Sequence, residues 1–168
     1  MAGALIVTAE LAPRDLAWLD GLRRRHYPPE RNRLPAHLTM FHALPPSSEL
    51  ELRSRLAAMA RGPAPRATAA GLMDLGGGTA IRIQSEELSV LREALADGLH
   101  GLLSAQDAHG WAPHVTIQNK VSNREARELR AALEPGFAPR PVAIGGLALH
   151  RYLGGPWDTL SRWSFRGA

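Results

Sequence analysis

The tripeptide pattern His-x-Thr occurs twice in this chain, at residues 37–39 and 114–116, and each copy stands inside an apolar run that predicts a β-strand. Because side chains alternate between the two faces of a strand, the His and the Thr of each copy point the same way. Two such strands facing one groove would place two imidazoles and two hydroxyls around a single small ligand. This arrangement suits acid–base chemistry on a phosphate ester, in which one imidazole accepts a proton and the other donates one.

The composition is that of a globular protein. The chain has 168 residues, of which 45% are hydrophobic, and this length suits a single domain, residues 1–168, or two closely fused lobes. The absence of cysteine excludes disulfides, thiolate nucleophiles and cysteine-based metal sites. No leader and no membrane-length apolar run is evident, so we expect a cytoplasmic monomer with no obligate protein partner and no membrane partner.

The net charge of +4 is a mild excess that is compatible with phosphates or RNA without requiring them. The densest basic stretch is Arg23-Arg24-Arg25. This stretch is expected to be either the solvated end of a helix or a contact with a phosphate backbone.

Periodicity and turn residues predict strands and helices in alternation. Strands are expected at 4–11, 37–44, 68–75, 79–84 and 114–121, with two more in 141–165 around a Gly-Gly-Pro turn. Helices are expected at 13–25, from Ser48 to about residue 60, after Ser85 with an apolar stripe reaching residue 102, and from Ser122 to about residue 133. Residues 106–113 are expected to form a loop.

The two His-x-Thr copies have matching surroundings about half a chain apart. A proline precedes each histidine closely, and a serine-capped amphipathic helix follows each strand. We therefore expect an α+β fold of two lobes related by a pseudo-twofold axis, one motif in each. Two antiparallel sheets would line a central cleft, with helices packed on the outside.

Strand alternation extends both faces beyond the motifs. Gln118 and Lys120, the chain's single lysine, are expected to share the cleft face of the second strand, where the ammonium would attract phosphate. A surface position at the strand end is the alternative for Lys120. On the first strand, Phe41 is expected on the cleft face, either stacking on a base or simply packing. His42 is expected on the opposite face, in a structural role.

The tail adds candidates for substrate binding. Arg151 could neutralise phosphate charge, and Tyr152 or Trp157 could stack on a nucleobase. A hairpin with ordinary aromatic packing is the alternative. No cofactor motif is found, and no metal site is expected, because neither motif histidine has a carboxylate or third histidine at ligand spacing.

These motifs resemble the two-histidine (2H) phosphoesterase superfamily, most closely its bacterial branch of 2′-5′ RNA ligases and RNA 2′,3′-cyclic phosphodiesterases. The resemblance rests on residues 37–44, on residues 114–120 and on the tail 152–157. It implies that His37, Thr39, His114 and Thr116 are catalytic, with His114 as general base on water and His37 protonating the departing ribose oxygen. The threonines would hold the non-bridging phosphate oxygens. His42 is an additional imidazole relative to the commonest family form.

The function predicted from the sequence is a metal-independent phosphodiesterase that opens 2′,3′-cyclic phosphates of RNA ends or nucleotides to a phosphomonoester. A 2′-5′ RNA ligase, or a hydrolase of another small cyclic phosphate, is an alternative on the same fold. A module that binds RNA ends without catalysis is an alternative of another class.

Overall fold

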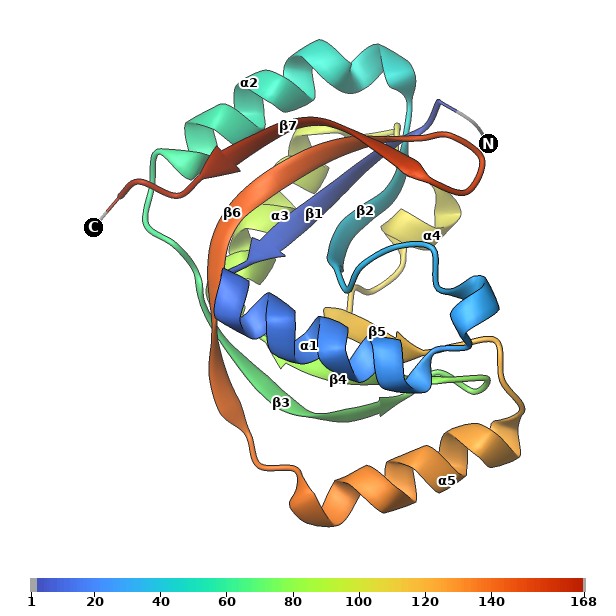
Figure 1. Cartoon of the computed structure of the whole chain (residues 1–168). Helices are drawn as coiled ribbons and strands as arrows, with labels where there is room; N and C mark the ends of the chain where they lie inside the picture. Colours follow the sequence, from blue (N-terminus) through green and yellow to red (C-terminus); the bar gives the residue numbers. More distant parts are fainter. Residues whose placement is uncertain (1–2, 168) are drawn as a thin grey trace.

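The computed structural model describes residues 3–167 and follows the expected order of strands and helices, with differences at some boundaries (Figure 1). The strands are β1 (Leu5–Leu11), β2 (Leu38–Leu44), β3 (Arg66–Asp74), β4 (Thr79–Gln84), β5 (His114–Gln118), β6 (Arg140–Tyr152) and β7 (Trp157–Ser164). The helices are α1 (Pro13–His26), α2 (Glu49–Ala60), α3 (Glu86–Gly98), α4 (Ala105–Ala108) and α5 (Asn123–Leu133). Short 3-10 turns occupy Pro29–Arg31, Pro46–Ser48 and Glu134–Gly136.

Serine caps begin two of the predicted helices. The hydroxyl of Ser85 accepts a hydrogen bond from the Leu88 N–H at 3.1 Å, and Ser122 accepts one from the Glu125 N–H at 3.1 Å. The cap expected at Ser48 is wrong. Ser48 has the helical backbone of the 3-10 turn that precedes α2, whereas a capping residue needs an extended backbone to turn its hydroxyl towards the helix.

Three other boundaries differ from the sequence prediction. The loop expected at 106–113 contains the end of the short helix α4, and α3 ends at Gly98 rather than near residue 102. The strand expected to reach residue 121 ends at Gln118. Lys120 there has a φ of 61°, in the left-handed region that a continuing strand does not use.

The α+β class is confirmed, but the two separate sheets expected from the sequence are not found. All seven strands form one antiparallel sheet in the order β1-β2-β5-β4-β3-β6-β7, and β1 also pairs with β6, so that six strands close into a barrel-like ring. The reason is the length of β6. Its residues 140–143 pair with β3, and its residues 144–151 pair with β1, so one strand joins both halves of the sheet.

The helices lie on the outside of this ring. In Figure 1, α2 lies above β7, α5 lies at the opposite end of the molecule, and α1 lies in front of β4 and β5. The core contains alternate residues of the strands, including Leu5 and Val7 of β1, together with residues of α2 and α3 such as Leu52 and Leu88. The other face of β1, β2 and β5 is thereby left for polar side chains. None of the helices within residues 3–167 combines the length and apolar character that a membrane crossing requires.

Candidate active site

The two His-x-Thr motifs lie on neighbouring antiparallel strands. Leu38 of β2 pairs with Val115 of β5, and both side chains are fully buried in the core. The residues that flank this pair therefore point to the opposite face. In this register His37 stands opposite Thr116, and Thr39 stands opposite His114. The structure thus brings the four predicted catalytic residues together on one face of the sheet.

Both motif histidines are fixed by the same backbone contact. Nδ1 of His37 lies 2.8 Å from the carbonyl oxygen of Pro35, and Nδ1 of His114 lies 2.8 Å from that of Ala112. A carbonyl only accepts, so each Nδ1 must carry the hydrogen. Each Nε2 then presents a lone pair, or a second N–H when the ring is protonated, to a ligand in the cleft.

The surroundings of His37 favour its neutral form. The pKa of His37 is lowered to about 4, mainly by burial. Nearby positive charges, Arg23 first among them, also lower this pKa, whereas the hydrogen bond with the Pro35 carbonyl raises it. The edge of the Trp157 ring lies against the imidazole, with a centroid separation of 4.7 Å. A neutral imidazole at neutral pH is ready to accept a proton, or to bind one when an anion enters beside it.

Arg23 is a site residue that the sequence analysis did not single out. It is buried, its Nη1 donates to the Thr116 carbonyl at 3.0 Å, and its Nε donates to the Asn32 side chain at 2.9 Å. Its guanidinium lies 4.2 Å from the centre of the Tyr27 ring. Helical spacing could have indicated that Arg23 is buried, because it follows Leu19 by four residues and lies on the same face of the helix. The solvated helix end expected for the arginine run does not describe Arg23, which is buried.

A break in strand register overturns the prediction for Phe41 and His42. Thr8 of β1 pairs with Thr39, but the next residue back, Val7, pairs with Phe41, so β2 carries an extra residue. Met40 and Phe41 are consequently both fully buried in the core. Phe41 therefore packs in the core and does not face the cleft, whereas His42 is turned outward.

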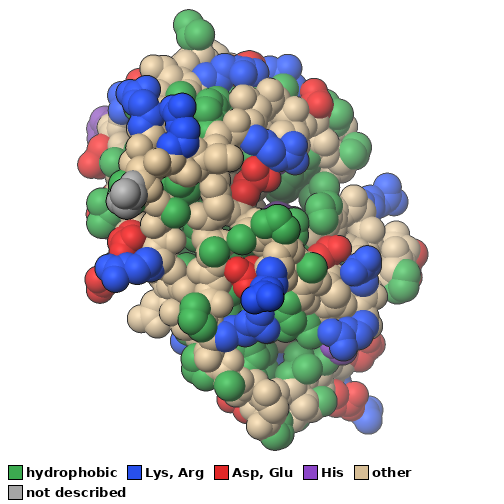
Figure 2. Space-filling model, turned by 60° about the vertical axis from the view of Figure 1, so that its left-hand side comes forward, with side chains coloured by type: hydrophobic (Ala, Val, Ile, Leu, Met, Phe, Trp, Pro, Cys, Tyr) green, Lys and Arg blue, Asp and Glu red, His purple; other side chains and the backbone are tan. Residues whose placement is uncertain are grey.

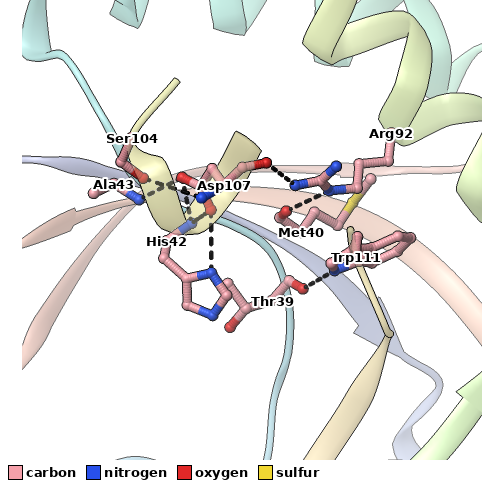
Figure 3. A network of polar contacts seen from close by, with 8 residues as sticks. All are labelled: Thr39, Met40, His42, Ala43, Arg92, Ser104, Asp107 and Trp111. Atoms are coloured by element: carbon pink, nitrogen blue, oxygen red, sulfur yellow. Dashed lines mark hydrogen bonds and ion pairs between the residues drawn. The ribbon is translucent and has the colours of Figure 1, made fainter. Parts of the chain in front are cut away.

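His42 is held by a buried carboxylate from the short helix α4. Asp107 accepts hydrogen bonds from the backbone N–H of His42 at 2.8 Å and of Ala43 at 3.0 Å, and its Oδ1 lies 3.2 Å from Nδ1 of His42 (Figure 3). Burial raises the pKa of Asp107, but the hydrogen bonds from His42 and Ala43 outweigh it and lower this pKa. The carboxylate is therefore ionised near neutral pH.

Arg92 and Trp111 support the same strand from behind. Arg92 is buried and donates to the main-chain carbonyls of Met40 at 2.9 Å and Asp107 at 2.8 Å. The indole N–H of Trp111 donates to the carbonyl of Thr39 at 3.1 Å. Figure 3 shows this network joining β2, α3 and the α4 segment, with the His42 ring on the side away from Arg92. The backbone carbonyls of Thr39 and Met40 are therefore fixed.

Trp157 is a predicted substrate-binding residue that the structure places beside His37. Together with His37, it lines a pocket of about 220 Å³. His150, also in this wall, bridges the hydroxyls of Thr8 at 2.8 Å and Thr159 at 2.9 Å. This pocket offers apolar and polar surface next to the imidazole of His37.

The other predicted contacts do not line the pocket beside His37. Arg151 is paired with Glu49 at the start of α2, and Tyr152 stands at the end of β6 beside the β6–β7 turn. Gln118 is buried, and Lys120 is exposed in the turn after β5. Gln118 and Lys120 line a depression beside the end of α1 instead of the pocket beside His37. The side-chain oxygen of Gln118 has no protein hydrogen-bond partner within residues 3–167.

Charge on the outer surface does not form one continuous basic track on the face shown in Figure 2. Arginine side chains there stand in separate groups, with Asp and Glu beside several of them. Within the part of the chain that is described, no cluster of three or more His, Asp or Glu side chains could hold a metal ion. The side chains that the structure gathers at the site are imidazoles, hydroxyls and the few charged groups that hold them.

Comparison with known proteins identifies the family. The sequence profile described as the 2′-5′ RNA ligase superfamily matches residues 11–156. The chain belongs to the 2′-5′ RNA ligase superfamily. This confirms the family indicated by the two motifs. A search of curated protein sequences gave no significant match.

Solved structures share the fold at low sequence identity. TT0787 of Thermus thermophilus is 20% identical with a TM-score of 0.66, and 98% of each chain is covered. E. coli LigT in complex with 3′-AMP is 16% identical with a TM-score of 0.61, covering 98% of this chain and 99% of LigT. A protein described as a phosphoesterase is 19% identical with a TM-score of 0.60, covering 98% of this chain and 99% of its own.

Proposed function

We propose that this member of the superfamily is a cyclic phosphodiesterase that opens 2′,3′-cyclic phosphates of RNA ends or nucleotides. The observation that carries the proposal is the Leu38–Val115 register, which sets His37 and His114 with their threonines on one face. A cyclic phosphodiester between them meets one proton acceptor and one proton donor. The 3′-AMP bound to E. coli LigT is a nucleotide phosphomonoester, the class of product that such a reaction forms.

The two imidazoles supply both proton transfers. In the assignment implied by the family resemblance, Nε2 of His114 takes a proton from water as its oxygen bonds to phosphorus. The bond from phosphorus to one ribose oxygen breaks, and that oxygen takes a proton from Nε2 of His37. Thr39 and Thr116 donate hydrogen bonds to the non-bridging oxygens and stabilise the charge of the transition state.

Because its pKa is low, His37 is neutral in the free protein near neutral pH, and the proposed role as an acid requires it to be protonated first. His37 must gain a proton before it acts as an acid, and a phosphodiester anion beside an imidazole favours its protonated form. Substrate binding and protonation of His37 are therefore coupled in this mechanism. After the reaction, His114 holds the proton and His37 is neutral, so a proton must return through solvent before the next turnover.

The deciding experiment measures release of phosphomonoester from 2′,3′-cyclic AMP in excess chelator. Turnover is expected to persist, because the proposed reaction needs no metal. His37→Ala and His114→Ala should each lower the rate by roughly 10²–10⁴-fold, the usual value of one proton transfer. His109→Ala is the matched control, since this imidazole is exposed at the end of α4.

Two outcomes would contradict the proposal. A wild-type rate in either motif variant would remove that histidine from catalysis, and loss of turnover with chelator would remove the metal-free reaction. A protein that retains an RNA end but releases no phosphomonoester would instead be a binding module. The family name also favours a test of the reverse direction, the joining of ends through a 2′-5′ bond, which the same groups can catalyse.

A further inference from the structure

The site contains a third imidazole that the acid–base mechanism does not use. The register break in β2 turns His42 outward, and 38% of its side chain is exposed. Because the extra residue in β2 changes the alternation between Thr39 and His42, these two side chains lie on the same side of the strand, as Figure 3 shows. The ionised Asp107 accepts from its Nδ1 side, so Nε2 is the nitrogen left free to meet a ligand.

The Asp107 carboxylate contacts the His42 ring from a buried position. Asp107 is almost completely buried, and among residues 3–167 the only basic side chain on its carboxylate is His42. Arg92 contacts the main-chain carbonyl of Asp107 instead. The contact of Nδ1 with this buried carboxylate fixes the orientation of the imidazole and directs Nε2 away from Asp107.

We propose that His42, held by Asp107, contacts the substrate directly, and that its Nε2–H donates a hydrogen bond to a non-bridging phosphate oxygen. This inference rests on the proposed phosphodiesterase function and adds to it a binding group specific to this chain. His37 and His114 exchange protons during the reaction, whereas His42 takes no part in the proton transfers and binds the phosphate. Asp107 is a positioning residue, because it acts through the ring.

The alternative cations around the cleft have other partners. Four arginines on surrounding elements each bind protein groups: Arg23 to Thr116 and Asn32, Arg92 to Met40 and Asp107, Arg151 to Glu49, and Arg162 to Glu10. Lys120 stands in the turn beyond β5. A phosphodiester between the motif histidines needs hydrogen-bond donors, and the partly exposed His42 is placed to supply one.

The test is the affinity for inorganic phosphate, measured by calorimetry on the wild type and on His42→Asn. The asparagine amide replaces Nδ1 and keeps the hydrogen bond to Asp107, but nothing replaces Nε2. We expect the dissociation constant to rise roughly 10- to 100-fold, as for loss of a hydrogen bond to a charged acceptor. KM for 2′,3′-cyclic AMP should rise with it.

Two further variants separate binding from folding. Asp107→Asn should weaken phosphate binding in the same direction, and His109→Asn, at an exposed imidazole beside α4, should leave it unchanged. If Asp107→Asn does not fold, His42→Asn still decides the matter, because its side chain is partly exposed and its contact with Asp107 is retained. Wild-type phosphate affinity in His42→Asn would overturn the proposal and leave His42 as a structural partner of Asp107.

The two proposals fail in different ways. If the wild type turns over cyclic phosphate and His42→Asn is indistinguishable from it, the phosphodiesterase stands and the role of His42 is wrong. If the wild type turns over no cyclic phosphate but His42→Asn weakens phosphate binding, the contact stands and the proposed reaction is wrong.

Discussion

At the scale of single residues, the three imidazoles of β2, of β5 and of the residue before β2 differ in the group that holds Nδ1. A neutral carbonyl holds His37 and His114, and a buried carboxylate holds His42. A carbonyl fixes the orientation of the ring without adding a charge, which leaves proton affinity to burial and to the ligand. A carboxylate also fixes the orientation of the ring and adds a negative charge beside it. The partner of Nδ1 therefore distinguishes His42 from the two motif histidines.

The low pKa of His37 predicts a loss of stability in mild acid. The unfolded chain binds a proton at His37 near pH 6.5, whereas the folded protein binds it only near pH 4. The contribution of His37 to the free energy of unfolding is complete above pH 6.5 and is lost as the pH falls towards 4. His150, whose pKa burial also lowers to about 4, adds an effect of the same sign.

Urea unfolding of the wild type and of His37→Asn, at about pH 7 and about pH 5, checks this prediction. The wild type should lose more stability between these two values than the variant does. An equal loss in both proteins would show that His37 titrates in the folded state as it does in the unfolded chain.

At the scale of elements, the site depends on a helix that carries none of the motif residues. Through Arg23, α1 holds the backbone of β5 at Thr116 and the loop at Asn32. The guanidinium reaches both groups at once because its donors are spread over a planar fork, which a lysine ammonium cannot reproduce. The helix thereby fixes the strand whose hydroxyl is expected to hold the phosphate.

Arg23→Lys is expected to lower the free energy of unfolding by about 1–3 kcal/mol, through loss of charged hydrogen bonds in a buried place. It should also lower kcat/KM for 2′,3′-cyclic AMP, because Thr116 is no longer fixed. Arg24→Lys is the control, since that neighbouring side chain is 70% exposed. Equal stability and activity in the two variants would show that the contact with Thr116 does not matter.

At the scale of the whole molecule, the continuous sheet predicts that the two halves unfold together. β6 pairs with β3 in one half and with β1 and β7 in the other, so neither half keeps its hydrogen bonds if the other opens. We expect one transition in urea, with coincident curves from tryptophan fluorescence and circular dichroism. Separate transitions would indicate two independent lobes.

A glycine of β6 allows this coupling to be tested by substitution. A methyl group at Gly146 would stand 2.5 Å from the carbonyl oxygen of Trp163 in β7, so the strands must separate slightly. Gly146→Ala should destabilise the protein by about 1–3 kcal/mol and shift both probes equally. Gly155→Ala, where a methyl group meets no atom within 4 Å, is the matched control. A shift in one probe alone would contradict the coupling.

The sequence by itself determined the family, the α+β class, most element boundaries and the two motifs, because each depends on local patterns of apolar, polar and capping residues. Alternation along two short strands was enough to put His with Thr on one face of each. The same rule misplaced Phe41 and His42, since a register break in β2 is set by pairing with β1 and leaves no mark in the local pattern.

Only the tertiary structure decided what surrounds the motifs. Asp107 follows His42 by 65 residues and Arg23 precedes Thr116 by 93, so no local spacing relates either pair. One sheet forms instead of the two expected because β6 extends beyond its pairing with β3 and also pairs with β1. Contacts between segments distant in the chain depend on how all the elements pack together, and for that reason the third imidazole could be placed only once the fold was known.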